Sequence, residues 1–426
     1  MLDIALIRKD PEAVAKALAK REYKVDFAEF LAWDAKRRQI IAEVEAMKAE
    51  RNRIGKVIPE MKKRGENADE LLAQMKDTAD RIKELDQELG QLDGTIEKFV
   101  AALPNLPADD VVAGGKDQNQ VVRVFGAQPA FAFKPKDHVE LETSLGLIDY
   151  ERGVKMGGSG FWLYSGLGAR IEWALLNYFV EEHLKDGYEF ILPPHILNWE
   201  CGFTAGQFPK FEDDVYRLTE ENMAFLLPTA ETALVNLYRD EILPESALPK
   251  KLFAYTPCYR REAGSYRANE RGMIRGHQFN KVEMFQFTTP EGSKKAHEEL
   301  IEKAERLVQG LGLHYRLMKL AAGDCSASMA TTYDIEVWLP SMNEYKEVSS
   351  VSNAYEYQAR RGRMRYRRDS DKKVDFIHTL NGSGLATSRI LPAILEQHQQ
   401  ADGSIAVPEP LQKWVGCKLI SKTGIK

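Results

Sequence analysis

Charged and aromatic side chains recur on alternate residues in two neighbouring segments of the chain. Arg260 and Glu262 are two residues apart, so both lie on one face if their segment is a strand. Phe279, Lys281 and Glu283 share a face of the second segment by the same count. An arginine fork can bind a phosphate, an aromatic ring can stack on a base, and a carboxylate can accept from an ammonium group. Together, the two segments could bind a nucleotide and an amino acid, although a solvent-exposed sheet face shows the same alternation.

The segments that carry these residues are predicted to be strands of an antiparallel sheet. Residues 252–262 and 278–289 alternate in polarity, and a polar, glycine-containing loop separates them. Two further strands and two helices are predicted at 333–339, 345–352, 167–185 and 291–311. Strands outnumber βαβ patterns, which favours an α+β fold with an antiparallel β-sheet core flanked by helices.

The N-terminal region is predicted to form two long antiparallel helices. Apolar or small residues follow one another at alternating steps of three and four at Met75, Thr78, Ile82, Leu85, Leu89, Leu92, Ile96 and Phe99. A less regular series precedes it at Ile40, Val44, Met47, Ile54, Ile58 and Met61. About 35 helical residues reach roughly 50 Å. A coiled-coil hairpin of this length is expected to project as an arm.

Charge is distributed unevenly along this hairpin. Residues 36–64 hold ten Lys and Arg against four Asp and Glu, whereas residues 65–98 hold four against ten, in a chain of net charge −5. A basic helix could contact nucleic acid even in an acidic protein. Opposite charges also suit simple pairing of the two helices, and a dimerisation or spacer coiled coil remains open.

Length and composition predict two domains, at 1–110 and 111–426. A chain of 426 residues exceeds the usual size of one core, and the Pro- and Gly-rich stretch 101–115 reads as a linker. No run of about twenty apolar residues and no signal peptide is recognisable, so we expect a cytoplasmic protein without membrane segments. The four cysteines lie far apart, which argues against disulfides and against a zinc site.

Several ordered stretches carry a more specific signal. The segment YTPCYRREAGSYRANERGMIRGHQFNKVEMFQF at 255–287 resembles motif 2 of class II aminoacyl-tRNA synthetases in its seryl form. DGYEFILPPHIL at 186–197 resembles motif 1, and NGSGLATSRILPAILE at 381–396 resembles motif 3. Seryl signatures also match at 204–211, 228–231, 347–353 and 358–361. The chain is therefore similar to seryl-tRNA synthetases over essentially its whole length.

The resemblance implies a serine–tRNA ligase with the class II fold. Such an enzyme activates L-serine with ATP to seryl-adenylate, releases pyrophosphate, and transfers serine to the 3′ end of tRNA-Ser, with tRNA-Sec as a further candidate. It also implies Mg²⁺ with ATP, a tRNA-binding helical arm, and a homodimer formed through motif 1. No zinc is expected.

Carried over by position, the resemblance assigns the site residues. The serine site is expected to comprise Thr229, Ala230, Glu231, Arg260, Glu283, Asn381 and Ser383. ATP is expected to contact Arg260, Arg261, Glu262, Phe279, Glu347, Val348, Ser349, Ser350 and Arg389. Glu347 and Ser350 are expected to hold Mg²⁺. The catalytic residues are expected to be Arg260, Glu347 and Arg389, and the motif 2 loop at 264–276 is expected to contact the tRNA acceptor end.

Two positions depart from the family pattern, and alternatives remain. Thr331 stands where the family commonly has a basic residue, and Ser388 where many relatives have glycine. A paralogue could use seryl-adenylate to load a carrier protein or serve as an inhibitor-resistant copy, and a structural coiled-coil protein could carry a degenerate core. The arginine run at 360–368 favours pairing with carboxylates over contact with RNA.

Overall fold

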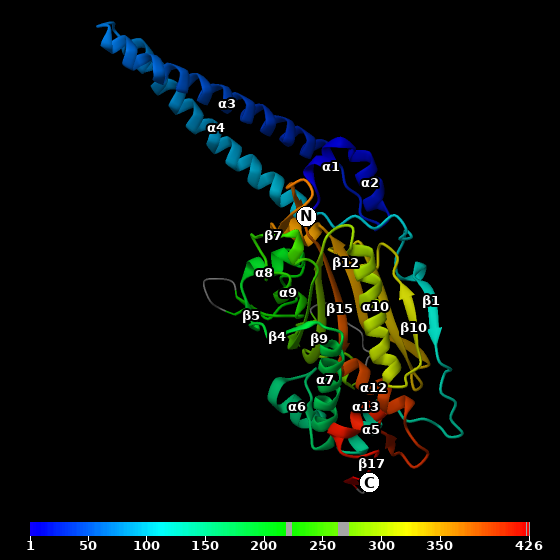
Figure 1. Cartoon of the computed structure of the whole chain (residues 1–426). Helices are drawn as coiled ribbons and strands as arrows, with labels where there is room; N and C mark the ends of the chain where they lie inside the picture. The colour runs from blue at the N-terminus through cyan, green and yellow to red at the C-terminus, as the bar shows by residue number, and fades with distance from the viewer. Residues whose placement is uncertain (219–223, 263–271, 423, 426) are drawn as a thin grey trace. The chain divides into compact units, whose positions relative to one another are not determined.

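The computed structural model describes residues 1–218, 224–262, 272–422 and 424–425 (Figure 1). The chain divides into two compact units. The helical unit comprises Leu2–Lys16 and Lys24–Pro104, and the catalytic unit comprises Met1, Ala17–Tyr23 and Asn105–Lys426. The chain therefore enters the catalytic unit before the two long helices begin, which differs from a single boundary near residue 110.

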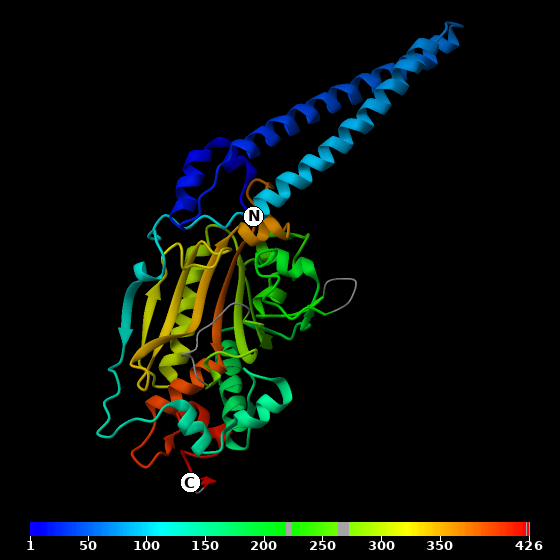
Figure 2. The same cartoon turned by 180° about the vertical axis from the view of Figure 1, so that it is seen from behind.

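The helical unit is built on a coiled coil of two long helices. Its helices are α1 (Ile4–Lys9), most of α2 (Pro11–Ala19), α3 (Ala28–Lys63) and α4 (Asp69–Ala102). Helices α3 and α4 run side by side in opposite directions (Figure 2). Their seam buries apolar side chains in two clusters, Ile40, Val44, Ile82 and Leu85, and Ile54, Ile58 and Ala68. The predicted antiparallel coiled coil is confirmed.

Ion pairs between α3 and α4 involve some of the opposite charges on the two helices. The pairs are Arg37–Asp93 at 2.5 Å, Glu43–Arg81 at 3.6 Å, Lys48–Asp86 at 3.9 Å, and Lys36–Glu88. Within the described part of the chain, four basic residues of α3 form no ion pair, namely Arg51, Lys56, Lys62 and Lys63. Hairpin pairing therefore accounts for only part of the positive charge on α3.

The catalytic unit is organised around an eight-stranded sheet with the order β1-β10-β11-β12-β15-β9-β8-β4. The strands in that order are Gln120–Phe125, Tyr315–Lys319, Thr331–Leu339, Glu344–Tyr355, His378–Ala386, Gln278–Thr288, Lys250–Tyr259 and Glu189–Ile191. Neighbouring strands are antiparallel except β4 and β8, which are parallel. The predicted α+β fold with an antiparallel core is confirmed.

Helices complete the catalytic unit and bury its main core. They are α5 (His138–Ser144), α6 (Tyr150–Gly157), α7 (Leu167–Lys185), α8 (Trp199–Thr204), α9 (Glu231–Leu234), α10 (Ser293–Gly310), α11 (Tyr357–Arg361), α12 (Thr387–Gln397) and α13 (Glu409–Val415). Helix α10 lies against one face of the sheet, over β12 and β15 (Figure 1). Fully buried side chains such as Phe179, Phe253 and Leu300 fill this core.

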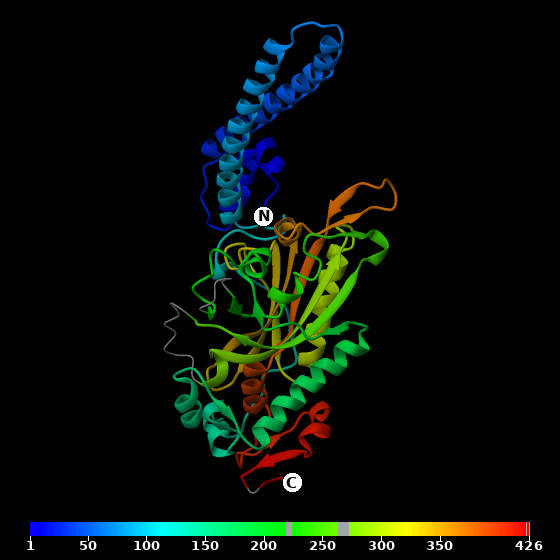
Figure 3. The same cartoon turned by 90° about the vertical axis from the view of Figure 1, so that its left-hand side faces the viewer.

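Short strands form four minor sheets in the described part of the chain. They are β13 (Arg365–Arg367), β14 (Val374–Phe376) and β7 (Ile242–Pro244); β16 (Ile405–Ala406), β17 (Leu419–Ser421) and β18 (Gly424–Ile425); β2 (Ile148–Asp149) and β3 (Leu163–Tyr164); and β5 (Ile196–Leu197) and β6 (Phe225–Leu226). The hairpin of β13 and β14 is orange in Figure 3. No helix among the described residues is long and apolar enough to span a bilayer.

The arginine run around this hairpin is largely paired inside the protein. Arg360 forms an ion pair with Glu356 at 2.8 Å, and Arg363 with Asp240 at 2.5 Å. Arg361 is buried and donates to the carbonyl oxygen of Phe208 at 2.6 Å. These contacts favour the structural interpretation of the run over contact with RNA.

The short segment Ala17–Tyr23 is integrated into the catalytic unit through Arg21. The Arg21 side chain is 9% exposed. Its guanidinium donates to the carbonyl oxygens of Ala322 at 3.0 Å and Cys325 at 3.2 Å, and also to that of Met329. A buried cation with several carbonyl partners is costly to remove, because each partner would lose its donor. Arg21 therefore secures the loop that precedes β11.

Candidate active site

A cavity of about 710 Å³ lies in the catalytic unit over strands β9, β12 and β15. Among the predicted site residues, those that line it are Thr229, Glu231, Arg260, Glu262, Phe279, Glu283, Glu347, Val348, Ser350, Asn381, Ser383 and Arg389. The structure thus brings together residues of motif 2, of motif 3 and of the seryl signatures at 228–231 and 347–353. Of the predicted motif 2 loop, residues 264–271 lie outside the described residues.

Three predicted residues have side chains outside the lining of this cavity. Ala230 is fully buried. The Arg261 side chain donates to the carbonyl oxygen of Asp213 at 3.0 Å, and the Ser349 hydroxyl donates to the carbonyl oxygen of Ser383 at 2.7 Å. In this structure these side chains are therefore buried or bonded to the backbone and do not line the cavity.

The first strand ends earlier than its sequence pattern indicates. Strand β8 ends at Tyr259, so Arg260 and Glu262 follow it and do not lie on a strand face. Glu262 has a φ of 52°, a left-handed conformation that non-glycine residues adopt at a cost. The prediction that both residues share a face of a strand is wrong, although both still line the cavity.

A β-bulge places the residues of β12. Strands β11 and β12 pair Ile335 with Ser349 and Glu336 with Glu347, which leaves Val348 as an extra residue. Residues three apart on a regular strand face opposite sides. The bulge breaks that alternation, so both Glu347 and Ser350 line the cavity.

One end of the cavity combines two buried carboxylates with a buried ammonium group. Lys281 forms an ion pair with Glu283, and its ammonium group donates to the Thr229 hydroxyl at 2.7 Å. Glu283 is 1% exposed and accepts a hydrogen bond of 3.2 Å from the Asn381 amide. Glu231 faces the same space. The arrangement can receive a small ligand that carries its own positive charge.

The ionisation of Glu231 is finely balanced. Burial, followed by the nearby Glu283 charge, raises the pKa of its carboxyl, which comes to about 7 once all its neighbours act. Hydrogen bonding from Gln358 and the positive charges of Lys281 and Arg260 oppose that rise. Glu231 therefore titrates near neutral pH, which is unusual for a glutamate.

Two polar atoms of β15 at this end lack partners. Among the described residues, nothing forms a hydrogen bond with the buried Asn381 Oδ1 or with the buried Ser383 Oγ. Buried polar atoms are almost always satisfied, so unpartnered ones at a cavity indicate a ligand that supplies the missing groups. A hydroxylated or ammonium-bearing ligand would meet that need.

The other end of the cavity presents arginines and an aromatic ring. The Arg260 guanidinium lies 5.2 Å from the centroid of the Phe279 ring. Arg389 donates to the carbonyl oxygen of Glu347 at 2.9 Å and forms an ion pair with its carboxylate at 3.4 Å. Cations on several sides of a cavity, with a ring for stacking, suit a nucleotide with its phosphates.

Sequence reasoning missed a further arginine at this end. Arg275 lines the cavity and forms an ion pair with Glu262, through a hydrogen bond of 2.7 Å from Nε. It lies within the quoted motif 2 stretch, between Gly272 and Gly276, which was the available signal. The predicted site also omits Lys281, which lies in the motif 2 stretch, and Gln358, which lies in the seryl signature at 358–361.

Oxygen donors gather between β11 and β12. Asp334 pairs in register with Ser350, and its buried Oδ1 atom has no hydrogen-bond partner among the described residues. Burial, followed by the charge of Glu347, holds the pKa of Asp334 well above its ordinary value. Across the described chain, no three His, Cys, Asp or Glu side chains converge on one metal position.

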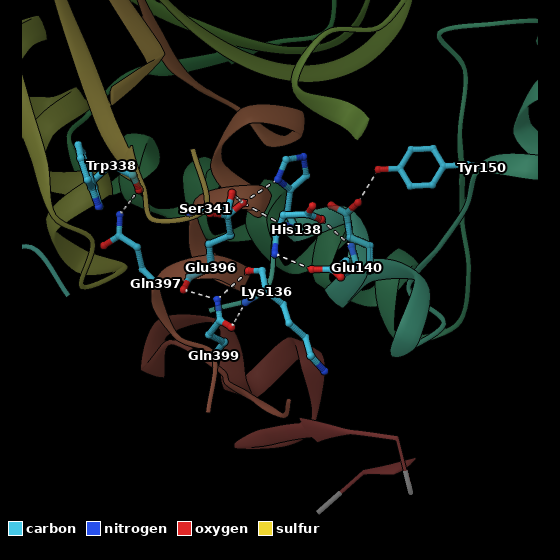
Figure 4. A network of polar contacts seen from close by, with 11 residues as sticks. Lys136, His138, Glu140, Tyr150, Trp338, Ser341, Glu396, Gln397 and Gln399 are labelled. Atoms are coloured by element: carbon cyan, nitrogen blue, oxygen red, sulfur yellow. Dashed lines mark hydrogen bonds and ion pairs between the residues drawn. The ribbon is translucent and has the colours of Figure 1, made fainter. Parts of the chain in front are cut away.

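A buried polar network fixes the helix that carries Arg389. Glu396, near the end of α12, accepts from the Ser341 backbone at 2.9 Å and from the Ser341 hydroxyl at 2.8 Å (Figure 4). It also accepts from the His138 backbone at 3.0 Å, and its carboxylate lies 2.8 Å from His138 Nδ1. The network joins α12 to the start of α5 and to the turn between β11 and β12. It therefore anchors the helix that carries Arg389.

The two departures from the family pattern lie in different environments. Ser388 lines the cavity directly before Arg389. Thr331 is 7% exposed at the start of β11, and its neighbour Thr332 lines the cavity in its place. Neither position is one of the predicted site residues that line the cavity.

Comparisons with known proteins give a consistent result. Residues 215–398 match the tRNA synthetase class II core domain (G, H, P, S and T), and residues 1–107 match the seryl-tRNA synthetase N-terminal domain. The chain is 64% identical to serine–tRNA ligase 2 of Clostridium acetobutylicum over 421 residues, covering 98% of this chain and 99% of that protein. It is 45% identical to serine–tRNA ligase of Clostridium tetani over 427 residues, covering 99% and 100%.

Solved structures agree over the whole chain. A seryl-tRNA synthetase from Pyrococcus horikoshii complexed with ATP has a TM-score of 0.93 and 34% identity, covering 100% of both chains. A cytoplasmic serine–tRNA ligase from Naegleria fowleri in complex with AMP has a TM-score of 0.88 and 27% identity, covering 100% of this chain and 99% of that one. The cavity described above therefore belongs to a fold that accepts adenine nucleotides in its relatives.

Proposed function

The chain belongs to the seryl-tRNA synthetase family and is an ATP-dependent ligase that joins serine to tRNA, and we propose that the two ends of its cavity divide the substrates. Serine binds with its ammonium group between Glu231 and Glu283. ATP binds between Phe279, Arg260 and Arg389. The observation that carries this assignment is the pair of buried polar atoms on Asn381 and Ser383, beside the carboxylates, that have no hydrogen-bond partner among the described residues.

Adenylate formation follows from this placement. A carboxylate oxygen of serine attacks the α-phosphorus of ATP, a new P–O bond forms, and the bond to pyrophosphate breaks. The nucleophile is already ionised, so no general base is required. Arg260 and Arg389 align the reactants and stabilise the charge that develops on phosphate. A terminal ribose hydroxyl of tRNA then attacks the acyl carbon, and AMP leaves.

The hydrogen-bonding groups at the serine end provide selection. A ligand with a hydroxyl group can satisfy the unpartnered atoms of Asn381 and Ser383, whereas alanine leaves them unpaired. Discrimination on the order of several kcal/mol is expected for a site built in this way. Selection against alanine therefore needs no separate correction step.

Glu347 and Ser350 fit the site of a Mg²⁺ ion that accompanies ATP. Both line the cavity, and the unpartnered Oδ1 of Asp334 lies beside Ser350 in register. Magnesium prefers oxygen ligands and commonly uses one or two carboxylates together with substrate phosphates. When bound, the ion neutralises phosphate charge.

The helical region within residues 1–110 is proposed to bind tRNA, with the catalytic domain at 111–426. The basic residues of α3 that form no ion pair among the described residues support this role, because phosphate contacts need available cations. We propose tRNA-Ser as the first tRNA substrate and tRNA-Sec as the second. We also propose a cytoplasmic location, because serine, ATP and tRNA are used together there.

A homodimer is proposed through the motif 1 region. Leu192 and Ile196 of motif 1 are 71% and 57% exposed, and Trp173 and Leu184 of the preceding helix α7 are 58% and 51% exposed. Large exposed apolar side chains are typical of contact surfaces. Sedimentation of a Leu192→Glu variant tests this, because a dimer through this surface should dissociate.

The proposed function is tested by two assays on the same preparation. Serine should stimulate exchange of pyrophosphate into ATP, and tRNA-Ser should become charged with serine. Exchange without charging of tRNA would contradict the tRNA role. If alanine supported exchange as well as serine does, the assignment of the serine end would be wrong.

A further inference from the structure

We propose that Gln358, a buried residue of α11, is a positioning residue that holds the Glu231 carboxylate in the orientation that receives the serine ammonium group. This inference rests on the proposed role of Glu231. Gln358 does not line the cavity, and it acts on the substrate only through Glu231. It belongs to the stretch 358–361, for which the sequence offered a family resemblance but no role.

The Gln358 amide is fully engaged by three partners. Its NH2 group donates to Glu231 Oε1 at 2.7 Å and to the carbonyl oxygen of Ala205 at 3.0 Å. Its carbonyl oxygen accepts from the Thr379 hydroxyl at 2.7 Å. Gln358 and Thr379 are 1% and 0% exposed. Because Thr379 and Ala205 hold the two ends of the amide, the remaining N–H must point at Glu231.

This contact leaves one oxygen of the carboxylate for a ligand. Gln358 engages Oε1 of Glu231, and the described residues form no hydrogen bond with Oε2. Glu231 lines the cavity, so the second oxygen can accept from an ammonium group. A carboxylate held at one oxygen by a fixed donor has its direction defined before the substrate arrives, which lowers the ordering cost of binding.

The same contact favours the ionised carboxylate. Four groups act on Glu231 from the surrounding elements, namely Glu283 and Lys281 on β9, Arg260 after β8, and Gln358 on α11. Burial and Glu283 raise the pKa of Glu231, Gln358, Lys281 and Arg260 lower it, and the net pKa is about 7. Losing the Gln358 donor should raise this pKa further. Protonated Glu231 would then be more abundant at neutral pH, and a neutral carboxyl cannot pair with an ammonium ion.

The test compares serine and ATP dependence in pyrophosphate exchange for Gln358→Met. A hydrogen bond to a charged group predicts a rise in the KM for serine of about ten- to a hundredfold at pH 7. The KM for ATP should stay within about twofold. The pH below which serine binding weakens should move upward in the variant. Unchanged serine KM with an unchanged pH profile would overturn the inference.

Two matched comparisons separate positioning from folding. Thr379→Val removes the hydroxyl that orients the amide and should raise the serine KM in the same direction, whereas Thr379→Ser keeps the hydroxyl and should restore it. Gln286→Met removes another fully buried glutamine, one that donates to the Tyr188 hydroxyl. That control should lose stability without a change in serine KM. If Gln358→Met fails to fold, equal serine KM values for Thr379→Val and Thr379→Ser would overturn the inference.

Failure of this inference can be distinguished from failure of the proposed serine site. Glu231→Gln should raise the serine KM, and adding Gln358→Met to it should have little further effect, because both changes act through one carboxylate. No effect of Glu231→Gln would remove the proposed role of Glu231 and this inference together. An effect of Glu231→Gln with none from Gln358→Met would overturn the role of Gln358 alone. Fully additive effects would also contradict action through Glu231.

Discussion

The two ends of the cavity handle charge in different ways. At the serine end, Glu283 and Lys281 are 1% and 8% exposed, and a fixed network surrounds them. At the nucleotide end, Arg389 and Arg275 form more exposed ion pairs with Glu347 and Glu262. The side chains of Arg389 and Glu347 are 29% and 45% exposed. The serine end is therefore organised before the substrate arrives, whereas the nucleotide end holds charges that phosphates can draw away from their present partners.

This difference decides what a substitution should cost. Removing one member of a buried ion pair leaves the other charge stranded, which is expensive. An exposed pair contributes little by itself, so its arginine matters through the ligand. Changes at the serine end should therefore damage both folding and activity, and changes at the nucleotide end should damage activity alone.

The largest effect is expected for Lys281→Met. Glu283 would keep its burial without its cation, so we expect a loss of about 3 kcal/mol in the free energy of unfolding. The kcat/KM for serine should fall by about a thousandfold. Urea unfolding and pyrophosphate exchange would measure the two effects. Lys303→Met, which breaks the ion pair with Asp186 away from the cavity, is the control and should lose stability only.

Arg389→Ala should show the opposite balance at the nucleotide end. Its loss removes a cation from the developing phosphate charge, and we expect kcat to fall by about a hundredfold. The melting temperature and the KM for serine should barely change, because the pair with Glu347 is solvent-exposed. A large loss of stability would contradict the proposed difference between the two ends. Arg363→Ala, at an exposed pair with Asp240, provides the matched control.

The unmodified protein should distinguish its two ends by pH. Glu231 has its pKa raised to about 7, so it gains a proton as the pH falls through that value. Serine binding should weaken by about tenfold per pH unit below 7, while the KM for ATP stays flat. Steady-state exchange between about pH 6 and pH 8.5 measures both. Equal pH dependence for the two substrates would break the comparison.

The smallest effect on catalysis in the cavity is expected for substitutions in the helical unit. Replacing Lys56, Lys62 and Lys63 with alanine should raise the KM for tRNA by about tenfold, with a weaker salt dependence. Serine-dependent exchange should not change. Replacing three exposed basic residues of α4, Lys76, Lys83 and Lys98, with alanine is the matched control. Equal losses from both triple variants would show that Lys56, Lys62 and Lys63 of α3 have no special role in tRNA binding.

Sequence periodicity predicted the elements better than it predicted the site. The apolar repeat around Ile82 and Leu85 specified the coiled coil, because a helical repeat depends only on local spacing. The roles of Arg260 and Glu262 depended on where β8 ends, and a left-handed backbone at Glu262 cannot be read from alternation. The bulge at Val348 was equally invisible, because it depends on pairing with β11.

Gln358 shows why partners of the site are harder to predict than the site itself. Its contacts with Glu231 and Ala205 join residues more than a hundred positions apart, and its third partner, Thr379, lies on strand β15. No spacing rule relates positions brought together by the sheet. Family resemblance marked the stretch that contains Gln358, but only the folded chain shows which group it touches.

Arg21 has a consequence for how such a chain could lose its helices. Its guanidinium holds the carbonyl groups of Ala322 and Cys325, immediately before residues that form the cavity wall. A later start codon that discarded the whole N-terminal region would also discard this clamp and loosen the reaction centre. A deletion that removes α3 and α4 should therefore be internal and keep the segment around Arg21, so that these carbonyl groups retain their donor.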